Sequence, residues 1–157
     1  MAKARKIPYL NPEQPLGICL QKILRTRFNE MISFEEGTVK GDDIEFLHDM
    51  RVSSRRVQAV LKIFRAAFPK RAYKKEYEQV RLLIRSLGVV RDYDVFIAKL
   101  EKLRAGSTAA DNRSLDMLII RKKVERDAKR KIMVRTIAEL NRTGYKENFM
   151  RFITTAI

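Results

Sequence analysis

Apolar residues recur at steps of three and four along most of the chain, which is the repeat of an amphipathic α-helix. The strict alternation typical of a β-strand does not rise above noise. The pattern therefore predicts an all-α protein, folded as an antiparallel bundle of about four long helices with short connections. The predicted helices cover about residues 13–36, 42–68, 70–103 and 114–141.

Helix-breaking and helix-capping residues mark the boundaries between these segments. Two glycines in EEGTVKGDD separate the first helix from the second, and Asp42 with Glu45 forms a capping-box-like start for the second. Pro69 marks the end of that helix. The small and polar residues of AGSTAADNRS form a loop between the third helix and the fourth.

Two features leave alternatives open. Gly88 interrupts the third apolar stripe, and one long helix with a weak point there is preferred over two helices end to end. Gly144 stops the fourth helix, and the remaining YKENFMRFITTAI begins a short fifth helix or docks as a tail.

The length of 157 residues suggests one domain. Residues 1–12 are predicted to be a basic flexible leader, and residues 13–157 a single helical domain. The leader has no apolar h-region, and no run approaches the roughly 18 apolar residues of a membrane span. The sequence therefore predicts a soluble, cytoplasmic protein with no membrane partner.

The net charge of +15 dominates the composition. A compact domain this basic repels itself, which favours a polyanionic partner such as nucleic acid, an anionic surface or polymeric phosphate. One cysteine and one histidine cannot supply four zinc ligands, so no metal site is expected, and no cofactor is expected. The chain shows no Ser/His/Asp set, carboxylate dyad or glycine-rich phosphate loop, and is predicted not to be an enzyme.

The segment LHDMRVSSRRVQAVLKIF carries the only histidine and a set of cations on one face of the second helix. At about 100° per residue, His48, Arg51, Arg55 and Lys62 lie within about 60° of His48, while Arg56 points elsewhere. This arrangement predicts a basic face and a separate buried face. The apolar residues expected on the buried face are Phe46, Met50, Val57, Leu61, Phe64 and Phe68.

Few acids are available to neutralise this face. From Met50 to Lys75 there are nine basic residues and no acid, whereas an ordinary solvated face interleaves acids at i+4. The fourth helix adds RKKVERDAKRKIMVR, which includes Arg121, Lys122 and Lys129. Two such helices can line a common groove that binds phosphate oxygens. A basic face that only confers solubility is the alternative.

Three stretches resemble the CHAD family, the conserved-histidine α-helical domain. HDMRVSSRRVQAVLKIF is similar to the family's His/Arg signature, LGVVRDYDV to its second signature, and NPEQPLGICLQKIL to its opening helix. The resemblance implies a fold of two four-helix halves around a basic central cavity. It also implies binding of inorganic polyphosphate by His, Arg and Lys side chains of that cavity.

The resemblance also suggests roles for individual residues. It implies that Arg91 is a further basic contact or a partner of the nearby acids, and that Asp92 and Asp94 orient arginines, because carboxylates repel phosphate. Together with the basic segments described above, the predicted polyphosphate-binding residues are His48, Arg51, Arg55, Arg56, Lys62, Arg91, Arg121, Lys122 and Lys129.

The chain departs from the family in two ways. Gln58 stands where the family often has another basic residue after its Arg pair. The resemblance also covers only the first half of the family's architecture, so the chain is a fragment or pairs with another chain. A symmetric homodimer would place two basic helices face to face. A CYTH-type triphosphatase is a further partner that the resemblance implies.

The leading hypothesis is non-catalytic binding of inorganic polyphosphate. A nucleic-acid-binding helical protein is the first alternative, although no helix-turn-helix spacing, RNA-binding aromatic motif or zinc module is present. The second alternative is an accessory subunit of a triphosphatase that acts on phosphate chains.

Overall fold

The computed structural model describes residues 3–155, and every regular element within that range is helical. The predicted all-α fold is confirmed. No helix of this part of the chain has the length and apolar character needed to cross a membrane. The α-helices are α1 (Leu16–Ile32), α2 (Glu35–Lys40), α3 (Ile44–Ile63), α4 (Lys70–Ala105), α5 (Ala109–Arg142) and α6 (Tyr145–Thr155), and a 3-10 turn, η1 (Arg65–Ala67), lies between α3 and α4.

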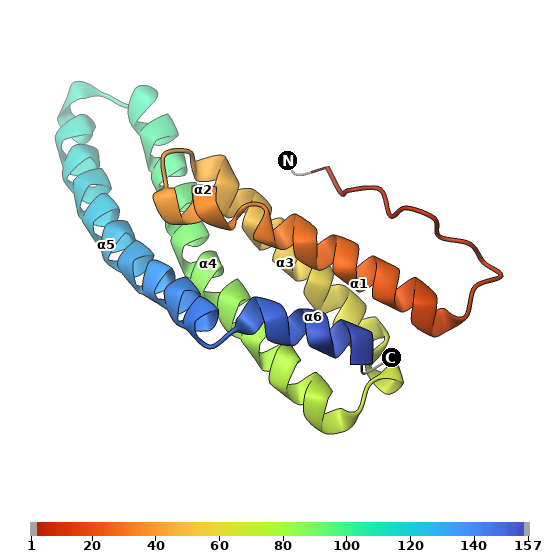
Figure 1. Cartoon of the computed structure of the whole chain (residues 1–157). Helices are drawn as coiled ribbons and strands as arrows, with labels where there is room; N and C mark the ends of the chain where they lie inside the picture. Colours follow the sequence, from red (N-terminus) through yellow and green to blue (C-terminus); the bar gives the residue numbers. More distant parts are fainter. Residues whose placement is uncertain (1–2, 156–157) are drawn as a thin grey trace.

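One hydrophobic core joins five of these helices. Helix α3 packs against α1 and α4, α5 runs along α4, and α6 returns to contact α1, α4 and α5 (Figure 1). Most of the apolar residues that the repeat predicts on α1, α3 and the first half of α4 are buried in this core, whereas others, such as Val124 and Ile132 of α5, are exposed. Representative buried side chains, one from each helix, are Leu24, Val57, Leu87, Ile137 and Phe149.

Aromatic side chains of α6 close the bundle. The rings of Phe28 and Phe149 stack with centroids 4.2 Å apart, and those of Phe68 and Phe152 stack at 5.0 Å. Aromatic pairs contribute about 0.5–1.5 kcal/mol beyond the burial of their area. The segment after Gly144 therefore forms the short helix α6, which docks on the bundle, rather than an irregular tail.

The outer half of the α4–α5 hairpin extends past the main core (Figure 1). There Ile97 and Leu100 pack against Ile119 in a small separate cluster. The Arg104 guanidinium also pairs with Asp116 across the hairpin. This outer half is therefore a two-helix arm held by its own contacts.

Helix α4 continues without a break for 36 residues, which confirms the single long helix. Gly88 lies inside it, at the contact with α3. A Cβ atom at Gly88 would lie 3.6 Å from Arg51 Nε, an ordinary van der Waals distance. The glycine is thus accommodated by the helix, and close packing does not require it.

The predicted break at EEGTVKGDD is partly helical. Helix α1 ends at Ile32, earlier than the predicted Glu36, and α2 follows after a short turn. Gly41 ends α2 in the left-handed conformation, with φ at +77°, which glycine adopts at little cost. Acidic Glu35 and Glu36 in the first turn of α2 favour this short helix through its dipole.

The boundaries of α3 also differ from the prediction. Asp43, rather than Asp42, caps the helix, and its Oδ1 accepts the N–H of Glu45 at 2.9 Å. The helix ends at Ile63 instead of Phe68, and the chain then tightens into η1; Phe68, which precedes Pro69, is extended, as the residue before a proline prefers.

Two further expectations were wrong. Phe46 is 40% exposed rather than buried in the core, because its ring lies over Gly37 of α2, where a Cβ would overlap it. The AGSTAADNRS loop is shorter than predicted: Thr108 is the N-cap residue of α5, its hydroxyl donates to Asp111 Oδ2 at 2.7 Å, and the helix starts at Ala109.

The segment before α1 lies along that helix (Figure 1). Arg27 Nη1 donates to the carbonyl of Arg5 at 2.8 Å, and Lys22 Nζ donates to the carbonyl of Tyr9 at 2.7 Å. Side chains of α1 therefore hold parts of the basic leader, and its flexibility stays a prediction.

We expect the substitution Gly88→Ala to raise the free energy of unfolding by about 0.5–1 kcal/mol, because alanine loses less backbone entropy in a helix interior. Urea denaturation followed by circular dichroism measures the change. A lower free energy of unfolding would contradict the open contact between Gly88 and Arg51.

Candidate functional site

His48, Arg51, Arg55 and Lys62 form what we call the α3 basic face. Arg55 and Lys62 are exposed, while His48 and Arg51 are half-buried beside the neighbouring helices. Within residues 3–155 none of the four forms an ion pair with a carboxylate. The face turned away from the core is therefore positively charged and not internally neutralised.

Two nitrogens of this face have unsatisfied hydrogen-bonding capacity. His48 Nδ1 and Arg51 Nε are both buried, and neither has a hydrogen-bond partner in the described part of the chain. Most buried polar groups in proteins are hydrogen-bonded, because an unpaired one costs about 1–3 kcal/mol. Seven buried side-chain nitrogen and oxygen atoms of the described residues lack a partner, and these two are the ones that belong to the α3 basic face.

Arg91 of α4 lies at the level of His48. The antiparallel register is set by the hydrogen bond from Gln58 Nε2 to Tyr77 Oη, at 3.4 Å, and by the contact of Arg51 with Gly88. Each turn further along α4 corresponds to one turn back along α3. The half-buried Arg91 therefore extends the basic face onto α4.

Arg56 has a different role from Arg55. Its Nη1 donates to Glu30 Oε1 at 3.0 Å, and Arg27 Nη1 donates to the other oxygen at 2.9 Å. Glu30 is only 1% exposed, so it needs these partners. The helical wheel separated Arg56 from the basic face, and the structure directs it to α1. A polyphosphate contact from Arg56 stays a prediction, which this ion pair disfavours.

The cations predicted on α5 do not face the α3 basic face. Helix α4 stands between α3 and α5 (Figure 1), so the expected groove between these two basic segments is absent from the described structure. Lys122 Nζ and Arg121 Nε bind Glu125 at 2.7 and 3.0 Å, and the Lys122 hydrogen bond in particular lowers the Glu125 pKa below its ordinary value. Lys129 is exposed on the same helix.

The two aspartates of LGVVRDYDV have separate environments. Asp94 is buried, and its Oδ1 accepts Arg126 Nε of α5 at 2.8 Å. Asp94 thus orients an arginine, as expected, but one that belongs to the α4–α5 hairpin. Asp92 is exposed and lines a shallow pocket with Tyr93, Phe96 and Lys122. Neither Asp92 nor Asp94 forms an ion pair with a residue of the α3 basic face in the described part of the chain.

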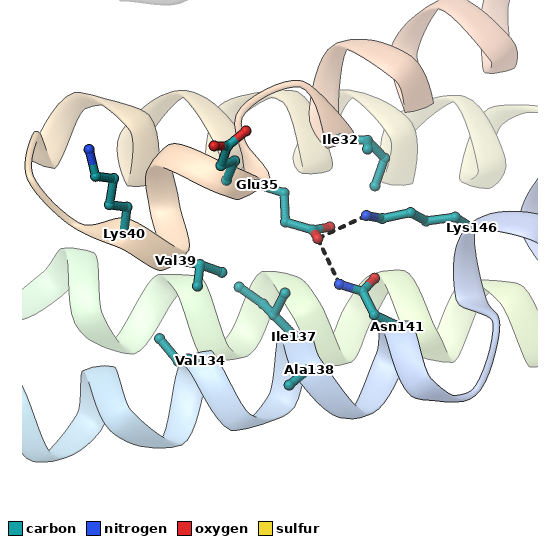
Figure 2. A pocket seen from close by; sticks show the side chains of 10 residues that line it. Ile32, Glu35, Val39, Lys40, Val134, Ile137, Ala138, Asn141 and Lys146 are labelled. Carbon is teal, nitrogen blue, oxygen red and sulfur yellow. Dashed lines mark hydrogen bonds and ion pairs between the residues drawn. The ribbon is translucent and has the colours of Figure 1, made fainter.

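A pocket of about 720 Å³ lies where α2, α5 and α6 meet. Figure 2 shows Glu35 at its centre, bonded to Lys146 Nζ at 2.9 Å and to Asn141 Nδ2 at 2.7 Å. Glu36 adds a second carboxylate, and Val39 and Ile137 add apolar walls. This pocket suits an anion poorly, because its acids are more central than its lysines.

Sequence reasoning missed the cations around the end of α3 and the start of α4. Arg65, Lys70 and Lys74 share a pocket with Lys62, the last member of the α3 basic face. The acid-free run from Met50 to Lys75 was the available signal. It could not show that the chain folds back at Pro69 and brings these side chains together.

Comparison with known proteins shows the family to which the chain belongs. The CHAD domain family model matches residues 22–156, which is nearly the whole chain. No curated protein gives a significant match. The matched range includes α3, both predicted signatures and the α3 basic face.

The neighbours Arg55 and Arg56 offer a matched pair of substitutions. We expect Arg56→Ala to lower the free energy of unfolding by about 1.5–3 kcal/mol, because Glu30 loses a charged hydrogen bond. Arg55→Ala should change it by less than about 0.5 kcal/mol, since Arg55 is exposed and outside any ion pair. Equal losses in urea denaturation would contradict the division of roles.

Proposed function

We propose that this chain, which belongs to the CHAD domain family, binds inorganic polyphosphate along the α3 basic face. Family membership is compatible with that ligand. The observation that carries the proposal is the combination of unneutralised cations with the buried, unpartnered His48 Nδ1 and Arg51 Nε. Arginine supplies forked donors and lysine a point charge, and both suit phosphate oxygens.

The shape of the face favours a linear polyanion. From His48 to Lys62 the α-helical rise corresponds to a distance of roughly 21 Å. A single phosphate ion would contact only one of the cations along this line, whereas a phosphate chain would contact each of them in turn. Adding Arg91 from α4 widens the line near His48.

The proposed role is binding without catalysis. Phosphoryl transfer usually uses carboxylates that hold Mg²⁺ against the phosphate. The nearest candidates, Asp92 and Asp94, point to other surroundings: Asp94 pairs with Arg126 and Asp92 lines a pocket with Lys122. The proposal therefore assigns the basic residues to ligand contact and none to bond cleavage.

We further propose that a second copy of the chain packs against α4. Four large apolar side chains recur along it at seven-residue intervals, and each is at least 40% exposed. Residues seven positions apart lie on nearly the same side of a helix, so these four form one exposed apolar stripe, here called the seam, which a second helix can cover. Two copies joined there would bring two basic faces into one assembly. The four residues are Leu82, Val89, Phe96 and Leu103.

The double substitution Arg51→Ala/Arg55→Ala should weaken the binding of length-defined polyphosphate by about 10- to 100-fold, because two charge-assisted contacts are lost. It should also reduce the slope of log affinity against log salt concentration by about 1.5–2. Arg113→Ala/Arg135→Ala, two exposed arginines of α5, removes the same charge elsewhere. Equal losses of affinity in both variants would show diffuse electrostatic attraction and contradict binding at the α3 basic face.

Duplex DNA that displaces polyphosphate at equal phosphate concentration would favour the nucleic-acid alternative.

Sedimentation velocity tests the second copy. We expect a dimer for the natural sequence and a monomer for Phe96→Glu, since a buried charge would disrupt the seam. Ile18→Glu on α1, at a similarly exposed apolar position, is the control and should leave the dimer intact. A natural-sequence monomer that binds polyphosphate at full affinity would refute the assembly.

A further inference from the structure

The α3 basic face leads into a pocket at one end of the bundle, which we call the end pocket. It has a volume of about 440 Å³ and lies where the end of α3, the turn η1 and the start of α4 meet. Lys62 belongs to both the α3 basic face and this pocket. The residues that line it are Lys62, Arg65, Lys70, Tyr73, Lys74, Tyr77 and Glu78.

Positive charge in the end pocket is not balanced from within. Lys62, Arg65, Lys70 and Lys74 form no ion pair with any carboxylate of the described residues. The one acid in the lining, Glu78, is turned to Arg81, whose Nη1 lies 3.4 Å from its Oε1. Four cations that repel one another in one concave site are stabilised when an anion binds among them.

The start of α4 adds to this imbalance. The N-cap residue, Pro69, supplies no side-chain hydrogen bond, and the first turn contains no acid. Lys70 and Arg71 occupy positions of the first turn where aspartate or glutamate would favour the helix dipole. The first backbone N–H groups of a helix lack intrahelical acceptors, and the positive end of the helix dipole lies there.

Two tyrosines, Tyr73 and Tyr77, line one side of the end pocket and supply hydroxyl groups that can donate hydrogen bonds. The rings of Tyr73 and Tyr77 stack with centroids 5.3 Å apart, and the Arg65 guanidinium lies 5.8 Å from the centroid of Tyr73. Burial, with a smaller effect of Tyr77, raises the Tyr73 pKa above its ordinary value, so this hydroxyl keeps its proton. Tyr77 Oη accepts from Gln58, which leaves its own O–H to donate.

We infer that the end pocket binds the terminal phosphoryl group of a phosphate chain whose interior lies along the α3 basic face. The inference rests on the proposed function. It adds the direction in which the phosphate chain lies on the protein. A terminal phosphoryl group has a second ionisation with a pKa of about 6 and so carries more charge than an interior group. Clustered cations and tyrosine donors suit that group, whereas the extended face suits the interior. Free phosphate and pyrophosphate share its chemistry.

The test compares free-ended polyphosphate with a chain of the same length whose ends are blocked as phosphoramidates. We expect the natural protein to prefer the free-ended chain by about tenfold, the effect of one or two charged contacts. Lys70→Gln/Lys74→Gln should abolish the preference and leave binding of the blocked chain unchanged. Lys99→Gln/Lys102→Gln, further along α4, removes equal charge and should keep the preference. A preference that survives in the first variant, or disappears in both, would overturn the inference.

Two further arms separate this inference from the proposed function. Loss of interior binding in Arg51→Ala/Arg55→Ala supports the α3 basic face. A free-end preference that persists while this double variant binds at full affinity would reject the α3 basic face but retain the end pocket.

The chain has no tryptophan and five tyrosines, so ring signals of Tyr73 and Tyr77 can be followed by NMR. Saturable shifts with pyrophosphate, but no preference for free-ended chains, would overturn the inference, because the pocket would then bind free phosphates only.

Discussion

One-sided burial of α3 is the constraint from which the rest of the site follows. Met50, Val57 and Leu61 are buried against α1 and α4, and this fixes the rotation of the helix about its axis. Once that rotation is fixed, Arg55 and Lys62 must lie on the outer side. The apolar core thus supplies the energy that keeps like charges together, since their mutual repulsion opposes that arrangement.

The positions of the acidic residues add to this separation of charge. Glu30 binds Arg27 and Arg56, Asp94 binds Arg126, and Glu125 binds cations of α5. Each of these carboxylates neutralises positive charge on a helix other than α3 or on the side of α3 toward α1. Part of the surplus of a chain with net charge +15 therefore lies along the outer side of α3 and in the end pocket, and further exposed cations, such as Lys99 and Arg135, lie on α4 and α5.

Helix α4 gives the molecule its asymmetry. Its first half completes the main core, its second half forms an arm with α5, and its length separates α3 from α5 (Figure 1). The cation-rich pocket lies near the start of α4, while the exposed apolar stripe follows the helix to the arm. A single long helix thus carries the cation-rich pocket near its start and the exposed apolar stripe along its length.

The apolar repeat alone predicted the helical class and the outward direction of Arg55, and it favoured a continuous α4, because helical periodicity is a local property. It also separated Arg56 from its neighbour. Only the tertiary structure showed that Arg56 binds Glu30, that α4 keeps the α5 cations away from α3, and that Lys62 and Lys74 share a pocket. Those facts depend on which helices pack together and at which register. Packing joins residues far apart in the chain, and no local repeat encodes it.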